Sequence, residues 1–339
     1  MDIAKDIKIL GIETSCDETA AAVVVGGGVV ASNIIFSQID IHRVHGGVVP
    51  EIAARNHIGK IDVVVGEALL AAGCELADID AIAATHGPGL IGALLVGLNF
   101  AKGLSFSADI PLVGINHLEG HIASAYLENP GFEPPFAALI ASGGHNHLVH
   151  VLDYGKYEVL GKTHDDAAGE AFDKVARSLG LPYPGGVQID CLAKDGNKNA
   201  IAFPRAKLVG HPLDFSFSGL KSAVLNYLNA SKMKGLEVCH ADVAASFQEA
   251  VVDVLSKNAI AACVQVGVDR LAVVGGVACN SRLREVLAQK CAEHEIALHI
   301  PKPIFCTDNA AMIAAAGYYH FLRGNFAGMS LNGLSSLAL

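Results

Sequence analysis

Two stretches of this chain predict the same order of strands and turns. The first, IKILGIETSCDETAAAVVVGGGVVASNIIFS, contains apolar strands at Ile7–Ile12 and Ala20–Val25, followed by a glycine turn and a third strand. The second, FAALIASGGHNHLVHVLDYGKYEVLGKT, contains strands at Phe136–Ala141, His147–Leu152 and Tyr157–Gly161. Short apolar runs bounded by turn residues are typical of strands, and a repeat of this kind is typical of a duplicated domain. The sequence therefore predicts a three-stranded meander at the head of each of two α/β lobes.

The segment ENPGFEPPF, residues 128–136, separates the repeats and is rich in residues that favour a linker. A chain of 339 residues can bury a core in each of two lobes. We therefore predict an amino-terminal lobe over residues 1–130, a carboxyl-terminal lobe over 136–325 and a tail over 326–339. Helical segments are expected after each meander, at Pro50–Leu70 and Asp165–Leu179. Two lobes of this kind would enclose a cleft, where small ligands usually bind.

The charge of the chain argues against a general binder of polyanions. The formal net charge is −10, whereas affinity for nucleic acids comes largely from neutralised phosphates. A nucleic acid would therefore need a local basic patch or a basic partner protein. The residues available for such a patch are Arg205, Lys207, Lys221, Arg282 and Arg284.

Cysteine usage and the apolar segments favour a cytoplasmic protein. The eight cysteines are scattered without a CxxC pair, which is typical of free thiols in a reducing compartment. The start, MDIAKDIKIL, lacks the long apolar run of a secretory signal. The stretch GPGLIGALLVGLNFA contains proline and glycine and is shorter than the ~20 residues that span a bilayer.

Four glycine-rich turns lie beside predicted strand ends or helix starts, at residues 11–19, 85–92, 141–147 and 275–283. Glycine lets the backbone approach a phosphate, and a helix amino terminus offers free N–H groups, so the turns indicate nucleotide binding. Ordinary strand-to-helix turns are the alternative. No turn matches a Walker P-loop, a G-x-G-x-x-G fingerprint or a G-x-S-x-G elbow. In the last turn, Asn280 or Ser281 is expected to cap the following helix.

Acidic residues gather on another predicted helix, in THDDAAGEAFDKVARSLG. Asp166, Glu170 and Asp173 have the spacing of one helix side, where three like charges need compensation by basic residues, sugar hydroxyls or a metal. A solvated acidic face is the alternative. Asp190 follows the turn PYPGG, and a helix beginning near Gly186 would hold it close to the predicted cleft.

The stretch NHLEGH suggests a metal site. His117 and His121 are four residues apart and lie on one helix face, so they could share an ion with a distant carboxylate such as Asp308. Two histidines and one carboxylate suit Fe(II) or Zn. A zinc peptidase needs H-E-x-x-H, whereas Glu119 lies two residues after His117, about 200° around the helix. A peptidase is therefore disfavoured. For Asp308, capping the helix that follows it is the alternative role.

Taken together, the motifs GIETSCDET, GGVVPE, GPGLIGALLVG, NHLEGH, SGGH, DDAAGEAFDK, YPGG, DFSFSGLK, GGVACN and CTDNAAMIA closely resemble those of one bacterial family. This is the TsaD-type tRNA N6-adenosine threonylcarbamoyltransferase family, once described as glycoproteases. The resemblance covers about residues 7–325 and implies a duplicated actin/sugar kinase/Hsp70 (ASKHA) fold, with two lobes around a nucleotide cleft. It implies that the carboxyl-terminal helix, from about residue 308, returns toward the amino-terminal lobe.

The resemblance also implies a reaction and its partners. Threonylcarbamoyl-AMP would give its threonylcarbamoyl group to N6 of adenosine 37 in tRNAs that read codons starting with A, and AMP would be released. The implied partners are a paralogous dimerisation subunit and a small ATPase, with no membrane. Alternatives are a metal-dependent peptidase, an ASKHA-type phosphotransferase and an ATP-driven binding module.

The resemblance assigns residues by motif position. His117, His121 and Asp308 would bind one divalent metal, Fe(2+) or else Zn(2+). The adenylate would be bound by Ile140, Ala141, Ser142, Gly143, Gly144, Asp173, Gly186, Asp190 and Asn280. No catalytic residue is assigned, and Asp17 and Glu18 are only candidates for accepting the amine proton. Asn146 stands where the family commonly has Thr, which puts local substrate contacts in question.

Overall fold

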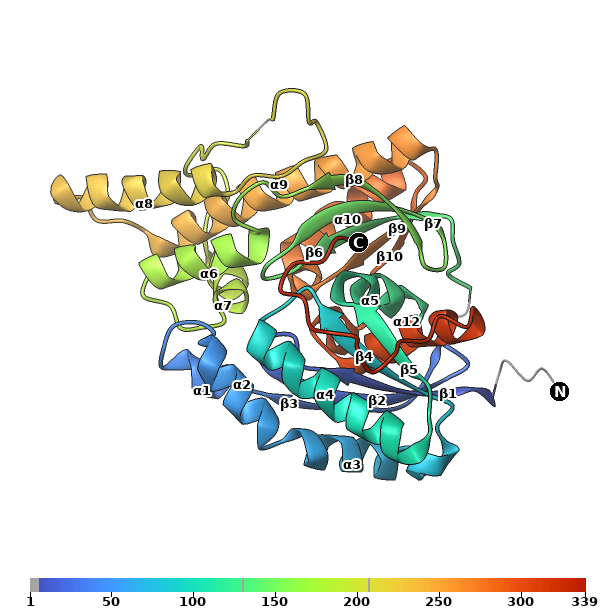
Figure 1. Cartoon of the computed structure of the whole chain (residues 1–339). Helices are drawn as coiled ribbons and strands as arrows, with labels where there is room; N and C mark the ends of the chain where they lie inside the picture. The colour runs from blue at the N-terminus through green and yellow to red at the C-terminus, as the bar shows by residue number, and fades with distance from the viewer. Residues whose placement is uncertain (1–5, 130, 207) are drawn as a thin grey trace. The chain divides into compact units, whose positions relative to one another are not determined.

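The chain divides into two compact units, each built around a five-stranded sheet. The computed structural model describes residues 6–129, 131–206 and 208–339. The first unit comprises residues 1–134, 153–156 and 304–339, and the second comprises 135–152 and 157–303. The strand orders are β3-β2-β1-β4-β5 and β10-β9-β6-β7-β8 (Figure 1).

In the first unit, helices cover both faces of the sheet. Its strands are β1 (Lys8–Glu13), β2 (Glu18–Val25), β3 (Val29–Ser37), β4 (Ala81–Gly87) and β5 (Leu112–Asn116). Its helices are α1 (Ile39–Arg43), α2 (Pro50–Ile58), α3 (Ile61–Ala71), α4 (Ile91–Ala108), α5 (His117–Ala123) and α12 (Ala310–Leu322), with short 3₁₀ turns at Leu76–Asp78 and Ser124–Tyr126. Figure 1 shows α3 and α4 on one face and α12 on the other.

Alternate residues of β1 pack against these two helical layers. Leu10 and Ile12 belong to the core cluster that includes residues of α3 and α4. Gly11 faces α12, where a Cβ atom on it would lie 2.3 Å from the carbonyl oxygen of Ala310. Successive side chains of a strand point to opposite faces of the sheet, so a strand covered on both faces is apolar throughout. On the face that meets α12 the helix lies so close that only glycine fits at position 11. Gly11 therefore allows α12 to pack directly on the sheet.

The carboxyl ends of three neighbouring strands meet at one edge of this sheet. Strand β1 pairs in parallel with β4, and β4 pairs in parallel with β5. Open sheets containing parallel strands usually bind ligands beyond these carboxyl ends. Helix α5 begins at His117, directly after β5, so the candidate histidines start from this edge.

The second unit repeats the strand order of the first. Its strands are β6 (Phe136–Ala141), β7 (Asn146–Asp153), β8 (Lys156–Lys162), β9 (Arg270–Val274) and β10 (Ala297–His299). Its helices are α6 (Ala168–Ser178), α7 (Gly185–Leu192), α8 (Ser218–Met233), α9 (His240–Val266) and α10 (Ser281–Glu293), with 3₁₀ turns at Ala193–Asp195 and Gly276–Cys279; α11 (Pro303–Cys306) begins at the boundary between the units. Both units therefore join a three-stranded meander to two parallel strands, which confirms the predicted duplicated α/β fold.

Some predicted helix boundaries are wrong. The segment predicted at Pro50–Leu70 is two helices, because the chain leaves the helical conformation around Gly59 and Lys60. Helix α6 begins at Ala168, so Asp166 precedes the helix and does not share a stripe with Glu170 and Asp173.

Helix α4 is long and apolar enough to cross a membrane by length and composition, with a mean hydropathy of 1.4 over 18 residues. A core helix of a soluble protein has the same properties. Leu98 and Ala101 of α4 belong to the core cluster of the first unit.

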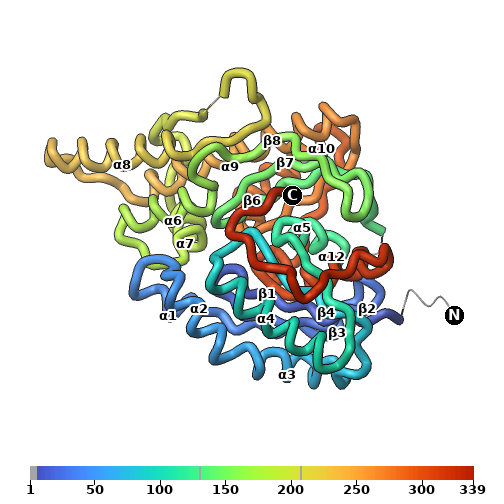
Figure 2. Tube along the Cα trace, viewed as in Figure 1, coloured from blue at the N-terminus to red at the C-terminus, as the bar shows by residue number. Residues whose placement is uncertain are grey.

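The carboxyl-terminal segment, red in Figure 2, returns along the β5 edge of the first unit. The Ala327 N–H donates to Leu112 O over 2.8 Å, and the Leu334 N–H donates to His86 O over 2.8 Å. The Asn116 side chain donates to Ala338 O over 2.9 Å. Hydrogen bonds to β4, to β5 and to Asn116 therefore hold residues 327–338 at this side of the first unit.

Candidate functional site

Three side chains of the first unit come together in an arrangement that could hold a metal ion. The rings of His117 and His121 lie 4.7 Å apart on α5, as expected for residues four apart on a helix. Asp308 Oδ1 lies 3.6 Å from His117 Nε2 and 3.3 Å from His121 Nε2. All three donor atoms lie within 4.8 Å of one another, and both histidines are buried. The structure thus brings together the three residues that the sequence singled out.

Asn309, rather than Asp308, caps the helix that follows them. The sequence had suggested Asp308 as the possible cap of this helix. In the structure α12 begins at Ala310, and Asn309 accepts a hydrogen bond from the Met312 N–H over 3.0 Å. The Asn116 side chain caps α5 in the same way, accepting from the Leu118 N–H over 2.9 Å. Two asparagine caps therefore orient the segments that carry the three residues.

The chemistry of the three donors fits a divalent metal. His121 Nε2 is buried and makes no hydrogen bond among the described residues, although Asp308 Oδ1 is 3.3 Å away. Burial, the largest cause, lowers the pKa of His121, which keeps this imidazole neutral as a metal requires. Burial also acts to lower the pKa of His117, but Asp308 and Glu13 outweigh it and raise that pKa to about 9, so a metal would displace a proton from His117 on binding. Two imidazoles and one carboxylate with open positions suit Fe(II) or Zn(II).

Glu13 is a buried carboxylate that sequence reasoning missed. It is 0% exposed at the end of β1, and its Oε2 lies 3.0 Å from His117 Nδ1. Burial raises its pKa, but the charge and hydrogen bond of His117 hold that pKa below the ordinary value. The available signal was a glutamate at the end of an otherwise apolar strand, where an unpaired charge would be costly.

Glu119 points away from the two histidines, as its position in NHLEGH predicts. Its Oε1 accepts a hydrogen bond from His320 Nε2 on α12 over 3.0 Å. No carboxylate of the NHLEGH segment is therefore placed beside the metal-binding atoms as a hydrolytic base.

In the second unit, the predicted substrate residues surround the carboxyl end of β6. Ile140 and Ala141 are buried in β6, and Ser142, Gly143 and Gly144 follow it. Two backbone hydrogen bonds join the first turn of α6 to this loop. The Gly169 N–H donates to Ser142 O over 3.2 Å, and the Glu170 N–H donates to Gly143 O over 3.1 Å. A Cβ atom on Gly143 or Gly144 would meet nothing within 4 Å. This glycine loop therefore leaves space in which a ligand could approach the backbone.

Helix α7 links the remaining predicted residues. At its start, the Gly185 N–H donates to Asp173 Oδ1 over 2.7 Å, directly before Gly186. Near its end, Asp190 Oδ1 accepts a hydrogen bond from the Ser281 hydroxyl over 2.8 Å. Asn280 caps α10 by accepting from the Leu283 N–H over 2.9 Å. Its Nδ2 donates to Gln248 over 2.8 Å. Both aspartates and Asn280 are thus fixed by partners within the unit.

Comparisons with known proteins identify the family. A model of the family described as TsaD, tRNA N6-adenosine threonylcarbamoyltransferase, matches residues 29–315. The tRNA N6-adenosine threonylcarbamoyltransferase of Clostridium perfringens (strain SM101 / Type A) is 60% identical over 331 residues, covering 98% of each chain. That of Clostridium botulinum (strain Kyoto / Type A2) is 57% identical over 335 residues, covering 99% of this chain and 98% of its own. The chain belongs to the TsaD family.

Solved structures agree on the fold. HypF of T. kodakarensis has a TM-score of 0.64 at 15% identity, covering 94% of this chain and 48% of its own. Component A of the (R)-2-hydroxyglutaryl-CoA dehydratase of Acidaminococcus fermentans has a TM-score of 0.56 at 16% identity, covering 94% of this chain and 100% of its own. At these identities the likeness shows the fold alone, and it confirms the predicted actin-like fold of this TsaD family member.

Asn146 holds the start of α6. It is 0% exposed, and its Oδ1 accepts a hydrogen bond from the Ala168 N–H, the first residue of α6, over 2.6 Å. A side-chain oxygen at this place satisfies one of the free N–H groups of a helix start. Asn146 therefore supports the helix that carries Asp173.

Basic residues neutralise the acidic cluster of this TsaD chain. Lys174 Nζ lies 2.6 Å from Glu170 Oε1 and 3.0 Å from Asp166 Oδ1. Lys221 Nζ lies 2.7 Å from Asp166 Oδ2. The sequence left open whether basic residues, sugar hydroxyls or a metal compensate these acidic charges, and the structure shows lysines beside Asp166 and Glu170.

Other described basic residues considered for a nucleic-acid patch also have partners within the second unit. Arg282 pairs with Glu249 over 2.8 Å, and Arg205 lies 3.5 Å from Asp253. The Arg284 guanidinium donates to Ala278 O over 2.7 Å. Lys207 lies outside the described residues. Several of the predicted cations are therefore already neutralised within the second unit.

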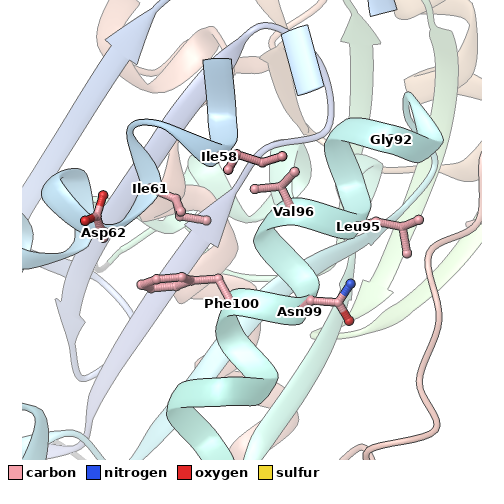
Figure 3. A pocket seen from close by; sticks show the side chains of 8 residues that line it. All are labelled: Ile58, Ile61, Asp62, Gly92, Leu95, Val96, Asn99 and Phe100. Atoms are coloured by element: carbon pink, nitrogen blue, oxygen red, sulfur yellow. The ribbon is translucent and has the colours of Figure 1, made fainter. Parts of the chain in front are cut away.

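An apolar groove of about 510 Å³ lies on the outer helical layer of the first unit (Figure 3). It is open to the surface and lined by Ile58, Ile61, Asp62, Gly92, Leu95, Val96, Asn99 and Phe100. None of these residues belongs to the metal cluster or to the predicted adenylate site, so the groove is distinct from both.

Proposed function

We propose that this chain transfers the threonylcarbamoyl group of threonylcarbamoyl-AMP to N6 of adenosine 37 in tRNAs that read codons starting with A. The observation that carries the proposal is membership of the TsaD family, with 60% identity over 98% of the chain to a relative of that name. The His117, His121 and Asp308 cluster and the open glycine loop at Gly143 and Gly144 support it. As an enzyme acting on tRNA, the chain is assigned to the cytoplasm.

His117, His121 and Asp308 would hold one divalent metal, Fe(2+) or else Zn(2+). When bound, the metal would supply positive charge that polarises the oxygens of the substrate. The carboxylate and the two buried imidazoles would supply three of the metal's ligands. The transfer needs no hydrolytic base, which agrees with the orientation of Glu119 toward His320.

The second unit would bind the adenylate. The backbone of Gly143 and Gly144 would be accessible for the phosphate or the carbamoyl group, since a Cβ atom on either glycine would meet nothing within 4 Å, and Ser142 lies buried beside them. Ile140 and Ala141 form the end of β6 beneath this loop. Asp173, Gly186, Asp190 and Asn280 would line the place of the ribose and the adenine. The hydroxyls of a ribose are donors, which suits carboxylate acceptors such as Asp173 and Asp190.

The reaction needs no nucleophile from the protein. The adenosine N6 would attack the carbamoyl carbon, the bond from that carbon to the phosphate oxygen would break, and AMP would leave with the electron pair. Binding of both substrates in alignment would supply most of the acceleration. The N6 proton must pass to a base. Glu18 is one candidate, because burial, followed by the neighbouring Asp17, raises its pKa well above the ordinary value, so its ionised form is a stronger base than an ordinary carboxylate.

We further propose that the chain acts with a paralogous dimerisation subunit and a small ATPase. The net charge of −10 and the internal pairing of Lys221, Arg205 and Arg282 leave a weak surface for tRNA. The partners would supply part of the tRNA contact. If the purified chain alone modified tRNA at full rate with excess adenylate, this dependence would be wrong.

The deciding experiment combines the chain and its partners with threonylcarbamoyl-AMP and unmodified tRNA, followed by mass analysis of the nucleosides. We expect threonylcarbamoyladenosine with the wild-type chain and a large loss with His117→Ala. Absence of the product, with His117→Ala indistinguishable from the wild type, would overturn the proposal. Formation of ADP that depends on a small acceptor would instead support a phosphotransferase of the same fold.

A further inference from the structure

Glu13 lies at the centre of a buried hydrogen-bond network beside the candidate metal site. It ends β1, Thr85 lies on β4, and His117 follows β5, so three neighbouring strands bring these residues to one edge. The Thr85 hydroxyl donates to Glu13 Oε2 over 2.6 Å, and His117 Nδ1 lies 3.0 Å from the same oxygen. The backbone N–H of Ser15 donates to Glu13 Oε1. All these groups are buried, so water does not compete for the bonds.

The proton on His117 must sit on Nδ1 if Nε2 is to bind a metal. An imidazole bound to a metal carries one N–H and provides the lone pair from the other nitrogen, so a metal at Nε2 displaces the proton held there and leaves the proton on Nδ1. His117 Nε2 faces Asp308, the third residue of the cluster, and Nδ1 faces Glu13. An ionised carboxylate can only accept hydrogen bonds, so Glu13 favours the tautomer with the proton on Nδ1. The Ser15 hydroxyl, 3.1 Å from Nδ1, can rotate to donate or accept and therefore does not select a tautomer.

We propose that Glu13 is a positioning residue that fixes the tautomer and ring orientation of His117 for metal binding. The inference rests on the proposed metal site and adds a residue to it that does not touch the metal. Partners of this kind orient metal-binding histidines in proteins and commonly change affinity by about 10- to 100-fold. His121 differs from His117, because its Nδ1 has no hydrogen-bond partner among the described residues. Glu13 therefore acts on one of the two histidines.

The isosteric change Glu13→Gln reverses this selection. The Ser15 backbone N–H is a fixed donor, so the amide oxygen of the substituted side chain must take the place of Oε1. The amide NH₂ group then takes the place of Oε2 and faces His117 Nδ1. The Thr85 hydroxyl can rotate to accept from the same group, so the hydrogen bonds of the network are kept. His117 Nδ1 must now accept, the ring proton moves to Nε2, and the lone pair for the metal is lost.

The test measures Zn²⁺ affinity of the full-length chain by competition with a fluorescent chelator. We expect Glu13→Gln to weaken Zn²⁺ binding by about 10- to 100-fold. Glu119→Gln is the matched control, because Glu119 is also a buried glutamate bonded to a histidine but faces His320. Its affinity should equal that of the wild type. Thr85→Val removes one bond to Glu13 without changing the charge that faces His117, and should have a smaller effect than Glu13→Gln.

A second measurement keeps the inference testable if Glu13→Gln does not fold. Histidine ¹⁵N resonances of the Zn²⁺-loaded wild-type chain, assigned with His117→Ala, should show His117 protonated at Nδ1 and coordinated through Nε2. A proton on Nε2, or Zn²⁺ affinity of a folded Glu13→Gln equal to that of the wild type, would overturn the role of Glu13 alone. Wild-type and His117→Ala chains that both fail to bind Zn²⁺ would overturn the metal site and this inference with it.

Discussion

Replacing Gly11 with Ala should disturb both the stability of the first unit and the metal site. A Cβ atom at Gly11 would lie 2.3 Å from Ala310 O and 2.8 Å from Ala314 N, and both are backbone atoms of α12. Real Cβ contacts below 3.0 Å are essentially never observed, so α12 must move away by at least about 0.7 Å. Gly11 pairs with Ala22 of β2 and Ala83 of β4, so β1 is held from both sides and cannot move instead.

The expected cost follows from overpacking a close-packed interior, which typically lowers the free energy of unfolding by about 1–3 kcal/mol. Asp308 lies two residues before Ala310, and binding sites tolerate displacements of only about 0.5 Å. We therefore expect Gly11→Ala to lower the melting temperature of the metal-free chain and to weaken Zn²⁺ binding by about tenfold or more.

Gly66→Ala provides the matched control. Gly66 lies within α3, and a Cβ atom on it would meet nothing within 4 Å. Alanine in a helix interior is more favourable than glycine by about 0.5–1 kcal/mol, so this variant should melt at a slightly higher temperature and bind Zn²⁺ like the wild type. A Gly11→Ala chain that melts and binds Zn²⁺ like the wild type would refute the packing explanation.

Three further predictions concern single residues. Asp308→Ala should abolish measurable Zn²⁺ binding in the chelator assay while α12 remains folded by circular dichroism, because Asn309 is the helix cap; loss of the helix would contradict this. Asn146→Ala should lower the free energy of unfolding by about 1 kcal/mol in urea, whereas Asn146→Thr should lower it less, because threonine keeps an oxygen acceptor; equal losses would count against the cap. Burial raises the pKa of Asp166, but Lys221 and Lys174 outweigh burial and hold this pKa below the ordinary value of 3.8. The ionised Asp166 therefore stabilises the fold above pH 3.8, and this stabilisation is lost as the pH falls through the lower pKa of the folded state. Acid titrations should therefore show a weaker loss of stability for Asp166→Asn than for the wild type, and identical acid limbs would exclude this role.

Local patterns were sufficient to predict most of the strands and the proximity of His117 and His121. The strand predicted at Phe136–Ala141 matches β6. A short, unbroken apolar run between a proline-rich segment and a Ser-Gly-Gly turn is too short for a typical helix and is typical of a buried strand. The pair His117 and His121 could be predicted to face one way, because helix geometry fixes residues four apart. The position of Glu119 followed from the same geometry.

Tertiary contacts explain what the sequence left open. Glu13 and His117 are 104 residues apart, and only the pairing of β1 with β4 and of β4 with β5 brings them together. Asp166 was expected on a helix stripe because its spacing fits one, but α6 begins at Ala168, whose N–H donates to Asn146 on β7. The cap of α12 was considered at Asp308 but is Asn309, a difference of one residue, which is finer than helix ends can be predicted.

The repeated sheet topology offers the same edge twice, and the two copies use it differently. Strands β1 and β4 correspond in order to β6 and β9. In the first unit, the strand ends carry Glu13 and Thr85, which fill the edge with a buried acidic network beside the histidines. In the second unit, β6 is followed by the glycine loop, and Gly275 follows β9 with a φ of +91°. A Cβ atom on Gly275 would lie 2.4 Å from Ala141 O, so no side chain fits there. The first unit therefore provides side chains suited to a metal at this edge, and the second unit provides exposed backbone suited to a phosphate. The two units share a strand order but carry different sequence motifs because their strand ends have different roles.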